Sequence, residues 1–258
     1  MKGYDLTKLN MQFRHARCED VISWVMEKIY PDAAMISSFQ ASGVVLLDLV
    51  RDIQPDLPVF FIDTGYHFPE TLEFRDRLIH EWKLNVVTIG PETKKKGTSK
   101  ENKEPLYKKD PDLCCRTHKV EPLKRLKKRS QITAWLSALR RDQNSNRESM
   151  NMFMHDQKGH IRIHPLIHWS RNKIWQHIYA KRLPFHPLYD QGYTSIGCFP
   201  PECTTRGVSE KRPRSGRWPD SDKTECGLHL DLVKEEEEAW VQQLKTREKK
   251  SEKTKKQV

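Results

Sequence analysis

The chain has 258 residues, with 46 Lys or Arg against 35 Asp or Glu, which gives a formal charge of +11 at pH 7. No apolar run approaches the roughly 18 residues that a membrane-spanning helix needs, so the sequence predicts a soluble protein with no membrane partner. The excess of positive charge favours an anionic partner, either a nucleic acid or a small phosphate or sulfate ester.

The amino-terminal third of the chain alternates between short apolar runs and segments whose apolar residues recur every three or four positions. Strands are expected at 33–39, 59–63 and 86–89, and helices at 21–30, 44–53 and 69–82. This alternation predicts an α/β fold in which a parallel, twisted sheet carries helices on both faces. Ligands of such folds bind beyond the carboxyl ends of the strands, where the loops emerge.

Two of the loops at that edge carry groups suited to a nucleotide. Ser37 and Ser38 begin a loop that enters a predicted helix, where backbone N–H groups bind anions, although serines also cap ordinary helices. Asp63, Thr64 and Gly65 follow the next strand, and the carboxylate of Asp63 suits a ribose hydroxyl or an adenine amine. A plain turn in which Asp63 caps the next helix is the alternative.

A third set of polar groups follows the apolar segment 132–139, which is expected to be a strand. Arg140 and Arg141 come at its carboxyl end, where their guanidinium groups would bind phosphate or sulfate oxygens. An ion pair with Asp142 is the alternative interpretation. Further along, a strand is expected at 161–165 and an amphipathic helix at 170–182.

Five of the six cysteines form an informative set: the adjacent pair Cys114 and Cys115, the separated pair Cys198 and Cys203, and the lone Cys226. Two pairs of cysteines and one further cysteine are typical of a protein in which four thiols bind a metal centre and a fifth thiol reacts. Buried small hydrophobic residues are the alternative, and Cys18 is expected to be one. Disulfides are disfavoured, because the extended basic tail indicates an intracellular protein with reduced thiols.

Cys226 lies in a polar, turn-rich part of the chain. A thiolate is the strongest side-chain nucleophile near neutral pH, so this residue is the candidate for covalent catalysis. The sequence predicts a mobile catalytic segment at about 204–230, which would carry the thiol between a closed site and the surface. An inert, exposed cysteine is the alternative.

The chain ends in segregated charge, with an acidic run at 235–238 followed by a basic stretch at 245–256. Such a segment is expected to be a charged helix or a disordered tail, which places one domain at 1–232 and a tail at 233–258. Aromatic residues are not interleaved with the basic stretch, and this disfavours a nucleic-acid partner.

Six sequence blocks occur together in a fixed order. They are Ser-Ser-Phe-Gln-Ala at 37–41, Phe-Ile-Asp-Thr-Gly-Tyr-His-Phe-Pro-Glu-Thr at 61–71, Asp-Pro-Asp-Leu-Cys-Cys at 110–115, Arg-Arg-Asp-Gln at 140–143, Leu-Pro-Phe-His-Pro-Leu-Tyr-Asp-Gln-Gly-Tyr-Thr-Ser-Ile-Gly-Cys at 183–198 and Glu-Cys-Gly-Leu-His at 225–229. Over about 11–229 the chain resembles the thioredoxin-dependent adenylyl-sulfate and phosphoadenylyl-sulfate reductases. The resemblance implies an adenine-nucleotide α-hydrolase-like fold with a modified phosphate loop.

The resemblance also implies a reaction. In this family the cysteine of the last block, here Cys226, attacks the sulfate sulfur, releases AMP and becomes S-sulfocysteine. A thiol of thioredoxin or glutaredoxin then releases sulfite. By the same resemblance Arg214 and Arg217 contact the phosphate and sulfate of the substrate, and Lys119 lies near a metal centre whose negative charge it offsets.

The two cysteine pairs resemble the branch of this family that prefers adenylyl sulfate and holds a four-iron, four-sulfur cluster (4Fe–4S). The resemblance makes Cys114, Cys115, Cys198 and Cys203 its ligands. The second pair departs from the usual Cys-x-x-Cys spacing, because the four residues 199–202 separate its thiols. Zinc bound by the same thiols, or no metal, is the alternative.

Together, the residues and the resemblance predict a cytoplasmic, assimilatory adenylyl-sulfate reductase. A phosphoadenylyl-sulfate reductase without a cluster, or with zinc, is the nearer alternative. A non-redox protein that binds a nucleotide or a nucleic acid is the more distant one. The sequence leaves a homo-oligomer open.

Overall fold

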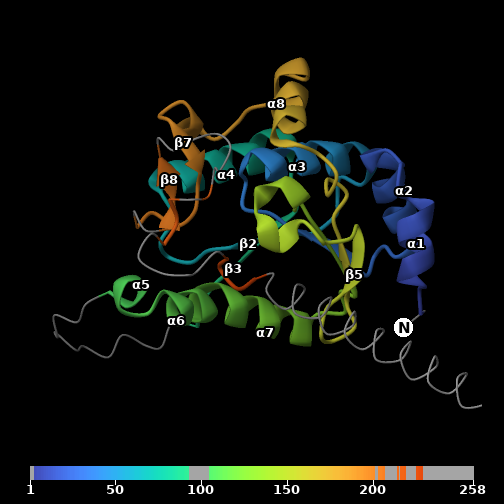
Figure 1. The fold of residues 1–258 in the computed structure, drawn as a ribbon, viewed down its shortest axis with the longest axis horizontal. Helices are drawn as coiled ribbons and strands as arrows, with labels where there is room; N and C mark the ends of the chain where they lie inside the picture. The colour runs from blue at the N-terminus through green and yellow to red at the C-terminus, as the bar shows by residue number, and fades with distance from the viewer. Residues whose placement is uncertain are drawn as a thin grey trace, which may run out of the picture.

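The computed structural model describes residues 3–92, 105–200, 203–206, 214, 216–218 and 225–228 (Figure 1). The predicted tail at 233–258 and much of the predicted mobile segment at 204–230 lie outside these residues, so the domain boundary stays a prediction. No helix within the described ranges combines the length and the apolar character that crossing a membrane requires.

A six-stranded sheet forms the centre of the fold, in the order β3-β2-β1-β4-β6-β5. Its strands are β1 (Ala33–Ile36), β2 (Val59–Ile62), β3 (Val86–Ile89), β4 (Ala134–Ser137), β5 (Phe153–His155) and β6 (Ile161–Ile163). All neighbouring strands run parallel except β5, which is antiparallel to β6. The predicted α/β fold is confirmed, and the predicted parallel sheet needs one correction at its β5 edge.

The sequence pattern does not predict β5, a three-residue strand at the edge of the sheet. A tight turn determines its pairing with β6. Asp156 Oδ1 accepts hydrogen bonds from the N–H groups of Lys158 and His160, each at 3.0 Å, and Gly159 adopts the left-handed conformation that the turn needs (φ 78°).

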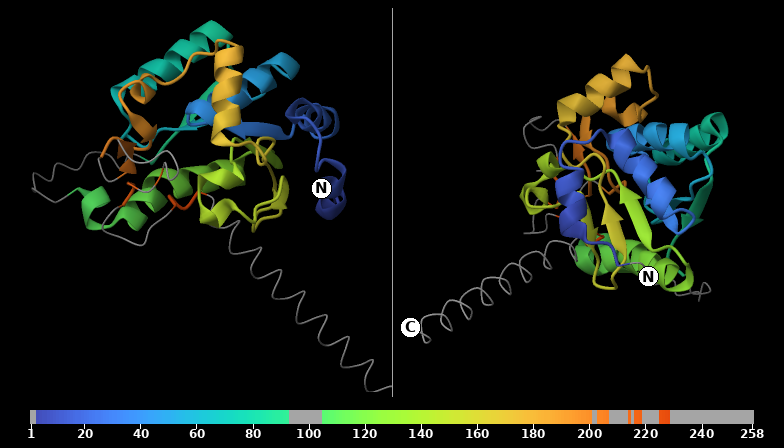
Figure 2. Two further views of the ribbon diagram at one scale, coloured as in Figure 1. Left: turned by 45° about the horizontal axis from the view of Figure 1, so that its top comes forward. Right: turned by 90° about the vertical axis from the view of Figure 1, so that its right-hand side faces the viewer.

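Helices cover both faces of the sheet, as predicted (Figure 2). One face carries α1 (Leu6–Gln12), α2 (Cys18–Lys28), α3 (Ala41–Ile53), α4 (Pro69–Trp82) and α8 (Arg171–Ala180). The other face carries α7 (Glu121–Arg129), which follows α5 (Leu106–Lys109), α6 (Pro111–Cys115) and the π-helical turn η1 (Arg116–Val120).

The alternation of strand side chains explains these two layers. In β1, Ala33 and Met35 join the large core under α2 and α3, whereas Ala34 packs into a smaller core with Leu123 of α7. Trp135 of β4 belongs to the same smaller core. Successive residues of a strand face opposite sides, so a strand covered on both faces must be apolar at nearly every position.

Predicted and observed boundaries agree for β3 and α4 and differ where the chain turns toward the pocket described below. The strand predicted to reach Phe39 ends at Ile36, because Phe39 is left-handed (φ 56°) and the chain leaves the sheet after Ser37. The patterns do not predict α5, α6 or the hairpin of β7 (Tyr193–Ser195) and β8 (Thr205–Arg206). The predicted burial of Cys18 is confirmed, and its thiol donates to the carbonyl of Pro165 at 3.1 Å.

Two fully buried histidines link the stability of the core to pH. Nδ1 of His164 bonds Ser137 Oγ at 2.9 Å, and Nε2 of His186 bonds Thr71 Oγ1 at 2.8 Å. Burial is the main cause that lowers the pKa of His164 to about 3 and the pKa of His186 to about 4. As the pH falls below about 6.5, the unfolded chain therefore takes up protons that the folded chain does not, and stability is lost.

Urea unfolding should report this loss. Between pH 7 and pH 5 we expect the free energy of unfolding to fall by about 2 kcal/mol for each of the two histidines. Glutamine at position 164 cannot ionise, so the loss in His164→Gln over the same interval should be smaller than that of the unaltered protein by about 2 kcal/mol. An equal loss in the variant would mean that other groups cause the pH dependence.

Candidate active site

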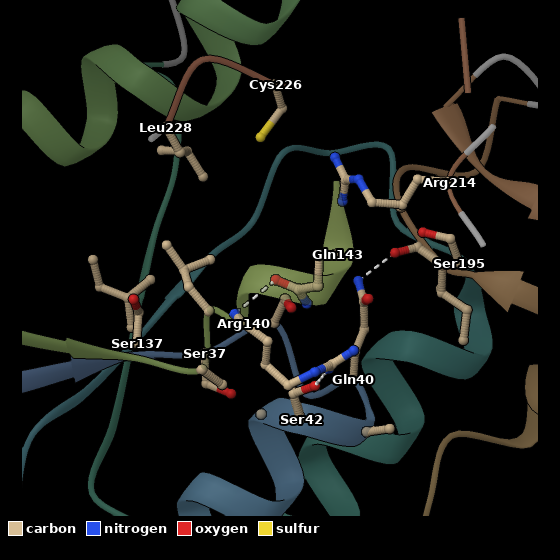
Figure 3. Close-up of a pocket in the computed structure, with 18 of the residues that line it drawn as sticks. Ser37, Gln40, Ser42, Ser137, Arg140, Gln143, Ser195, Arg214, Cys226 and Leu228 are labelled. Atoms are coloured by element: carbon tan, nitrogen blue, oxygen red, sulfur yellow. Dashed lines mark hydrogen bonds between the residues drawn. The ribbon is translucent and has the colours of Figure 1, made fainter. Parts of the chain in front are cut away.

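A pocket opens at the carboxyl edge of the sheet, where the loops after β1, β2 and β4 meet the segment that carries Cys226 (Figure 3). Parallel strands end at the same edge, so segments far apart in the sequence converge there. Of the predicted site residues, the pocket is lined by Ser37, Ser38, Thr64, Lys119, Arg140, Cys198, Arg214, Arg217 and Cys226. It is not lined by Asp63, Gly65 or Arg141.

The loop after β1 presents the start of α3 to the pocket. Gln40, and neither serine, is the N-cap of α3, so Ser37 and Ser38 do not cap this helix. Ser37 Oγ accepts a hydrogen bond from the N–H of Phe39 at 3.2 Å, and a Cβ on Gly43 would lie 2.9 Å from that oxygen. The close approach leaves the first turn of a 13-residue helix facing the cavity, where its dipole favours an anion.

Some residues of the loop after β2 form a turn, and another lines the pocket. Asp63 Oδ1 accepts a hydrogen bond from the N–H of Gly65 at 2.8 Å, and Gly65 is left-handed (φ 73°). These two residues therefore form the turn. Thr64 is the residue that faces inward, and its Oγ1 lies 3.4 Å from Sγ of Cys198.

The two adjacent arginines after β4 have different environments. Arg140 is buried and lines the pocket, where Nε donates to Asp142 at 2.9 Å and Nη1 donates to Ser42 Oγ. The ion pair with Asp142, the alternative interpretation, and the predicted place in the pocket thus occur together. Arg141 points away, and its Nε donates to the carbonyl of Met150 at 2.8 Å. The side chains of these two neighbouring residues point in different directions. The sequence pattern does not show which of them enters the pocket.

Positive charge dominates the lining. Among the described residues that form the wall, the cations are Lys119, Arg140, Arg147, Arg171, Arg214 and Arg217, and the carboxylate is Glu225. Apolar side chains complete the wall, among them Ile36, Leu139, Trp175 and Leu228. An apolar surface beside several guanidinium groups suits a flat base joined to a multiply charged anion.

The arginines of the carboxyl-terminal segment are held inside this wall. Arg217 donates from Nη2 to the carbonyl of Ile196 at 2.7 Å. Burial lowers the pKa of both Arg214 and Arg217, and for each the negative charge at Glu225 opposes that effect. A further anion in the pocket would relieve the same burial cost, so these side chains favour an anionic ligand.

Cys226 lines the pocket near Arg214 (Figure 3). Burial and the negative charge of Glu225 act to raise the pKa of this thiol, but the charge of Lys119, the N–H of Leu228 and the charge of Arg214 together bring the pKa below its usual value. A thiol with a lowered pKa next to cations is the form that attacks electrophiles.

The other predicted thiols line a second, smaller pocket. Cys114, Cys115, Cys198 and Cys203 are all buried, and all four contribute to its wall. Thr64, Lys119 and Cys198 line both pockets, so they form a shared wall. The π-helical turn η1 follows directly after Cys115 and carries Lys119 into this wall. Single π-helical turns often occur at functional sites.

Charge links this shared wall to the thiols. Burial acts to lower the pKa of Lys119, but electrostatic interaction with the sulfurs of Cys198, Cys226 and Cys115 outweighs it and raises that pKa. Burial raises the pKa of Cys203 to about 11, so this thiol is protonated unless a bound cation compensates it. Four soft, buried donors around one pocket fit an iron–sulfur or zinc centre chemically. No three His, Cys, Asp or Glu side chains in the described ranges are grouped to hold a single ion.

The unusual spacing of the second cysteine pair is accommodated by two local features. A Cβ on Gly197 would lie 2.0 Å from the carbonyl oxygen of Cys203, so only glycine allows the chain to pass there. The N–H of Cys203 donates to the carbonyl of Pro200 at 2.8 Å. This bond returns Cys203 to the pocket despite the longer insert.

Three charged residues of the pocket wall, Arg147, Arg171 and Glu225, are absent from the predicted site. Arg147 and Glu225 bond each other, at 2.7 Å from Nε to Oε1, although 78 residues separate them. Glu225 begins the last of the six sequence blocks, which is the only signal that singles it out. Arg147 follows the Arg-Arg-Asp-Gln block and has no pattern of its own.

Residues 32–205 match the family described as the phosphoadenosine phosphosulfate reductase domain. The chain is similar to an adenosine 5'-phosphosulfate reductase of Halalkalibacterium halodurans, with 38% identity over 87% of this chain and 96% of that protein. It is also similar to a phosphoadenosine 5'-phosphosulfate reductase of Gloeobacter violaceus, with 34% identity over 88% of this chain and 95% of that protein. The crystal structure of a phosphoadenylyl-sulfate reductase from Candida auris, in a phosphate complex, shares the fold, with a TM-score of 0.67 at 24% identity over 77% of this chain and 97% of that one.

Proposed function

This chain belongs to the phosphoadenosine phosphosulfate reductase family, and on that premise we propose that it is an assimilatory adenosine 5'-phosphosulfate (adenylyl-sulfate) reductase of the cytoplasm. The observation that carries the proposal is that Cys226, a thiol of lowered pKa, lines the pocket together with six cationic side chains of the described residues. A nucleophile beside an anion site is what sulfur transfer from a sulfate ester of a nucleotide requires.

The proposed reaction begins with the thiolate of Cys226. It attacks the sulfur of the sulfate group, and the new S–S bond forms as the bond from that sulfur to the phosphate oxygen breaks. AMP leaves with the electron pair of the broken bond, and the enzyme carries S-sulfocysteine at position 226. Cations near the leaving phosphate stabilise the charge that develops on it, and Lys119, Arg214 and Arg217 are the side chains of the wall assigned to this role.

A protein dithiol of the thioredoxin or glutaredoxin class completes the proposed reaction. One of its thiolates attacks Sγ of Cys226, and sulfite leaves with the electron pair of the S–S bond. The second thiol then resolves the mixed disulfide and returns Cys226 to the thiolate. The dithiol loses two electrons and two protons, and sulfur(VI) becomes sulfur(IV).

The remaining predicted groups are assigned to the nucleotide. The helix start after Ser37 and Ser38 would bind the phosphate. Arg140, whose Nη1 donates to Ser42 Oγ in the first turn of that helix, would meet an anionic oxygen of the same ligand, and the apolar side chains would hold the adenine.

A 4Fe–4S cluster is the proposed cofactor, with Cys114, Cys115, Cys198 and Cys203 as its ligands. When bound, it would supply a fixed charge distribution beside the shared wall, because the thiols provide both electrons of the reaction. Cys198→Ser should lose most of the roughly four irons that such a cluster contributes per chain. Iron and acid-labile sulfide are measured after anaerobic purification, and Cys18→Ser, a buried thiol outside this pocket, is the control. Zinc in place of iron would support the alternative metal.

The decisive assay supplies adenylyl sulfate or phosphoadenylyl sulfate with reduced thioredoxin under anaerobic conditions and measures sulfite. We expect faster turnover of adenylyl sulfate. Faster turnover of phosphoadenylyl sulfate would favour the second candidate, which the 34% identity to the Gloeobacter violaceus protein supports. Absence of sulfite from both nucleotides would overturn the proposed function.

A further inference from the structure

Glu225, the residue before Cys226, is a buried carboxylate with several hydrogen-bond donors; it is 3% exposed. Arg147 donates to both of its oxygens, at 2.7 Å from Nε and 3.0 Å from Nη2, and Nδ2 of Asn144 donates at 2.7 Å. Nη2 of Arg214 adds a bond at 3.2 Å. Two parallel hydrogen bonds from one guanidinium group to one carboxylate are among the strongest side-chain contacts.

These bonds keep the carboxylate charged. Burial acts to raise the pKa of Glu225, but the charges of Arg147 and Arg214 outweigh it and lower the pKa. The side chain is therefore an anion at neutral pH, and its bond to Arg147 is a true ion pair.

Two of the three residues that donate to Glu225, Asn144 and Arg147, belong to the loop after β4, which also shapes the nucleotide pocket. Arg147 ends the short helix η3 (Ser145–Arg147) and is 5% exposed. It also donates to Oε1 of Gln143, which accepts a bond from the N–H of Arg140 at 3.1 Å (Figure 3). Glu225 thus connects the Cys226 segment to the same loop that brings Arg140 into the pocket.

The segment is held on the other side of Cys226 by apolar contacts. Leu228 packs against the small core of the α7 face. Gly227 is left-handed (φ 85°), and a Cβ added there would lie 3.4 Å from Val120. An ion pair before the cysteine and apolar packing after it hold the residue between them in the wall of the pocket.

We propose that Glu225 is a positioning residue, whose ion pair with Arg147 holds Cys226 at the pocket and whose separation from Arg147 lets the thiol leave it. This inference rests on the proposed function, in which Cys226 first attacks a substrate inside the pocket and then meets an external dithiol. The sulfonate of the intermediate would compete with Glu225 for Arg214, which donates the longest of the four bonds. That competition would remove one of the four bonds to Glu225 and leave those from Arg147 and Asn144.

The first test measures access to Cys226 in the full chain, without nucleotide or reductant. Neutral iodoacetamide labels the thiolate, and mass spectrometry of the Cys226 peptide follows the rate over a pH series. The plateau rate above the pKa of the thiol reports access, because the thiolate fraction is then constant. In Glu225→Gln we expect this plateau to rise by about tenfold or more.

Two comparisons separate the ion pair from a general loss of stability. Arg147→Gln should match Glu225→Gln, and the double variant should stay within about twofold of either single variant, because all remove one contact. The matched control is Asp48→Asn. Asp48 is 1% exposed and pairs with Arg51 and Lys181 between α3 and α8, outside the pocket lining. Its plateau should stay within about twofold of the unaltered protein, and an equal rise there would overturn the proposal.

The second test measures transfer of SO3 from adenylyl sulfate to Cys226 in a single turnover without reductant. Glu225→Gln should slow transfer by about tenfold to a hundredfold, while affinity for AMP changes by less than about threefold. Glu225→Asp keeps the charge on a shorter side chain and should give intermediate values in both tests. It also serves in place of Glu225→Gln if that variant does not fold.

The outcomes separate this inference from the proposed function. If the unaltered protein forms no SO3 adduct, the proposed function fails, and the labelling rates still decide whether the ion pair holds the thiol. If the adduct forms at the same rate in all Glu225 and Arg147 variants and the plateau rates are unchanged, the proposed function stands and the positioning role is wrong.

Discussion

Replacing Cys226 by serine is expected to abolish sulfite formation from adenylyl sulfate, with kcat/KM reduced by about 10⁴-fold or more. Serine has nearly the same size, but its hydroxyl stays protonated near neutral pH. For the thiol, burial opposes ionisation, yet the charge of Lys119 and the N–H of Leu228 lower its pKa. The chemistry depends on that ionised sulfur, so the loss should not be recovered at any pH between 6 and 9.

Three measurements check this prediction. The sulfite assay gives the rate, calorimetry gives the affinity for AMP, and intact mass after mixing with adenylyl sulfate shows whether SO3 is attached. Cys226→Ser should bind AMP within about threefold of the unaltered protein and carry no adduct. Cys18→Ser, whose thiol is buried in the core, is the control and should behave like the unaltered protein in all three. Sulfite formed by Cys226→Ser at an unreduced rate would falsify the assignment of the nucleophile.

The central strands β1, β2 and β4 could be predicted because they are covered on both faces. Phe60 and Phe61 are neighbours that pack into different cores, so β2 must be continuously apolar and is easy to find. The same local signal is absent from β5, which is short and lies at an edge. The position of the candidate site at the carboxyl edge of the sheet was equally predictable, since loops that follow parallel strands converge there.

The direction of single side chains was not predictable in this way. Arg140 and Arg141 are chemically equal and adjacent, yet one lines the pocket and the other bonds Met150. Asp63 closes a turn, while Thr64 beside it faces the pocket. Each outcome depends on a backbone angle after the strand has ended, where no period exists to indicate which residue points inward.

Long-range charge pairing was missed for a different reason. Glu225 and Arg147 are single charged residues in segments of many charges, and a sequence gives no distance between them. The cysteine pairs were found because thiols are rare and paired, so chance occurrence is less plausible. Rare residue types therefore indicate a site from sequence, whereas arginine and glutamate require the fold.

The second large effect is expected for Lys119→Met, which should reduce kcat/KM at pH 7 by about a hundredfold. Lys119 lies in the wall shared by the two pockets, and its charge is the leading contribution that lowers the pKa of Cys226. Without that charge the pKa of the thiol rises. Activity requires the thiolate, so kcat/KM decreases as the pH drops through the pKa of the thiol. A higher pKa therefore shifts this acid limb of the pH profile to higher pH.

The measurement is the pH profile of kcat/KM between pH 6 and 9.5, with Lys119→Arg as the matched control. Arginine keeps the positive charge, so its acid limb should stay near that of the unaltered protein even if the rate is lower. For Lys119→Met the limb should move up by about one pH unit, and part of the activity should return in alkaline solution. A profile lowered in height with its acid limb unmoved would mean that Lys119 acts on the substrate anion and leaves the ionisation of Cys226 to the other groups of the wall.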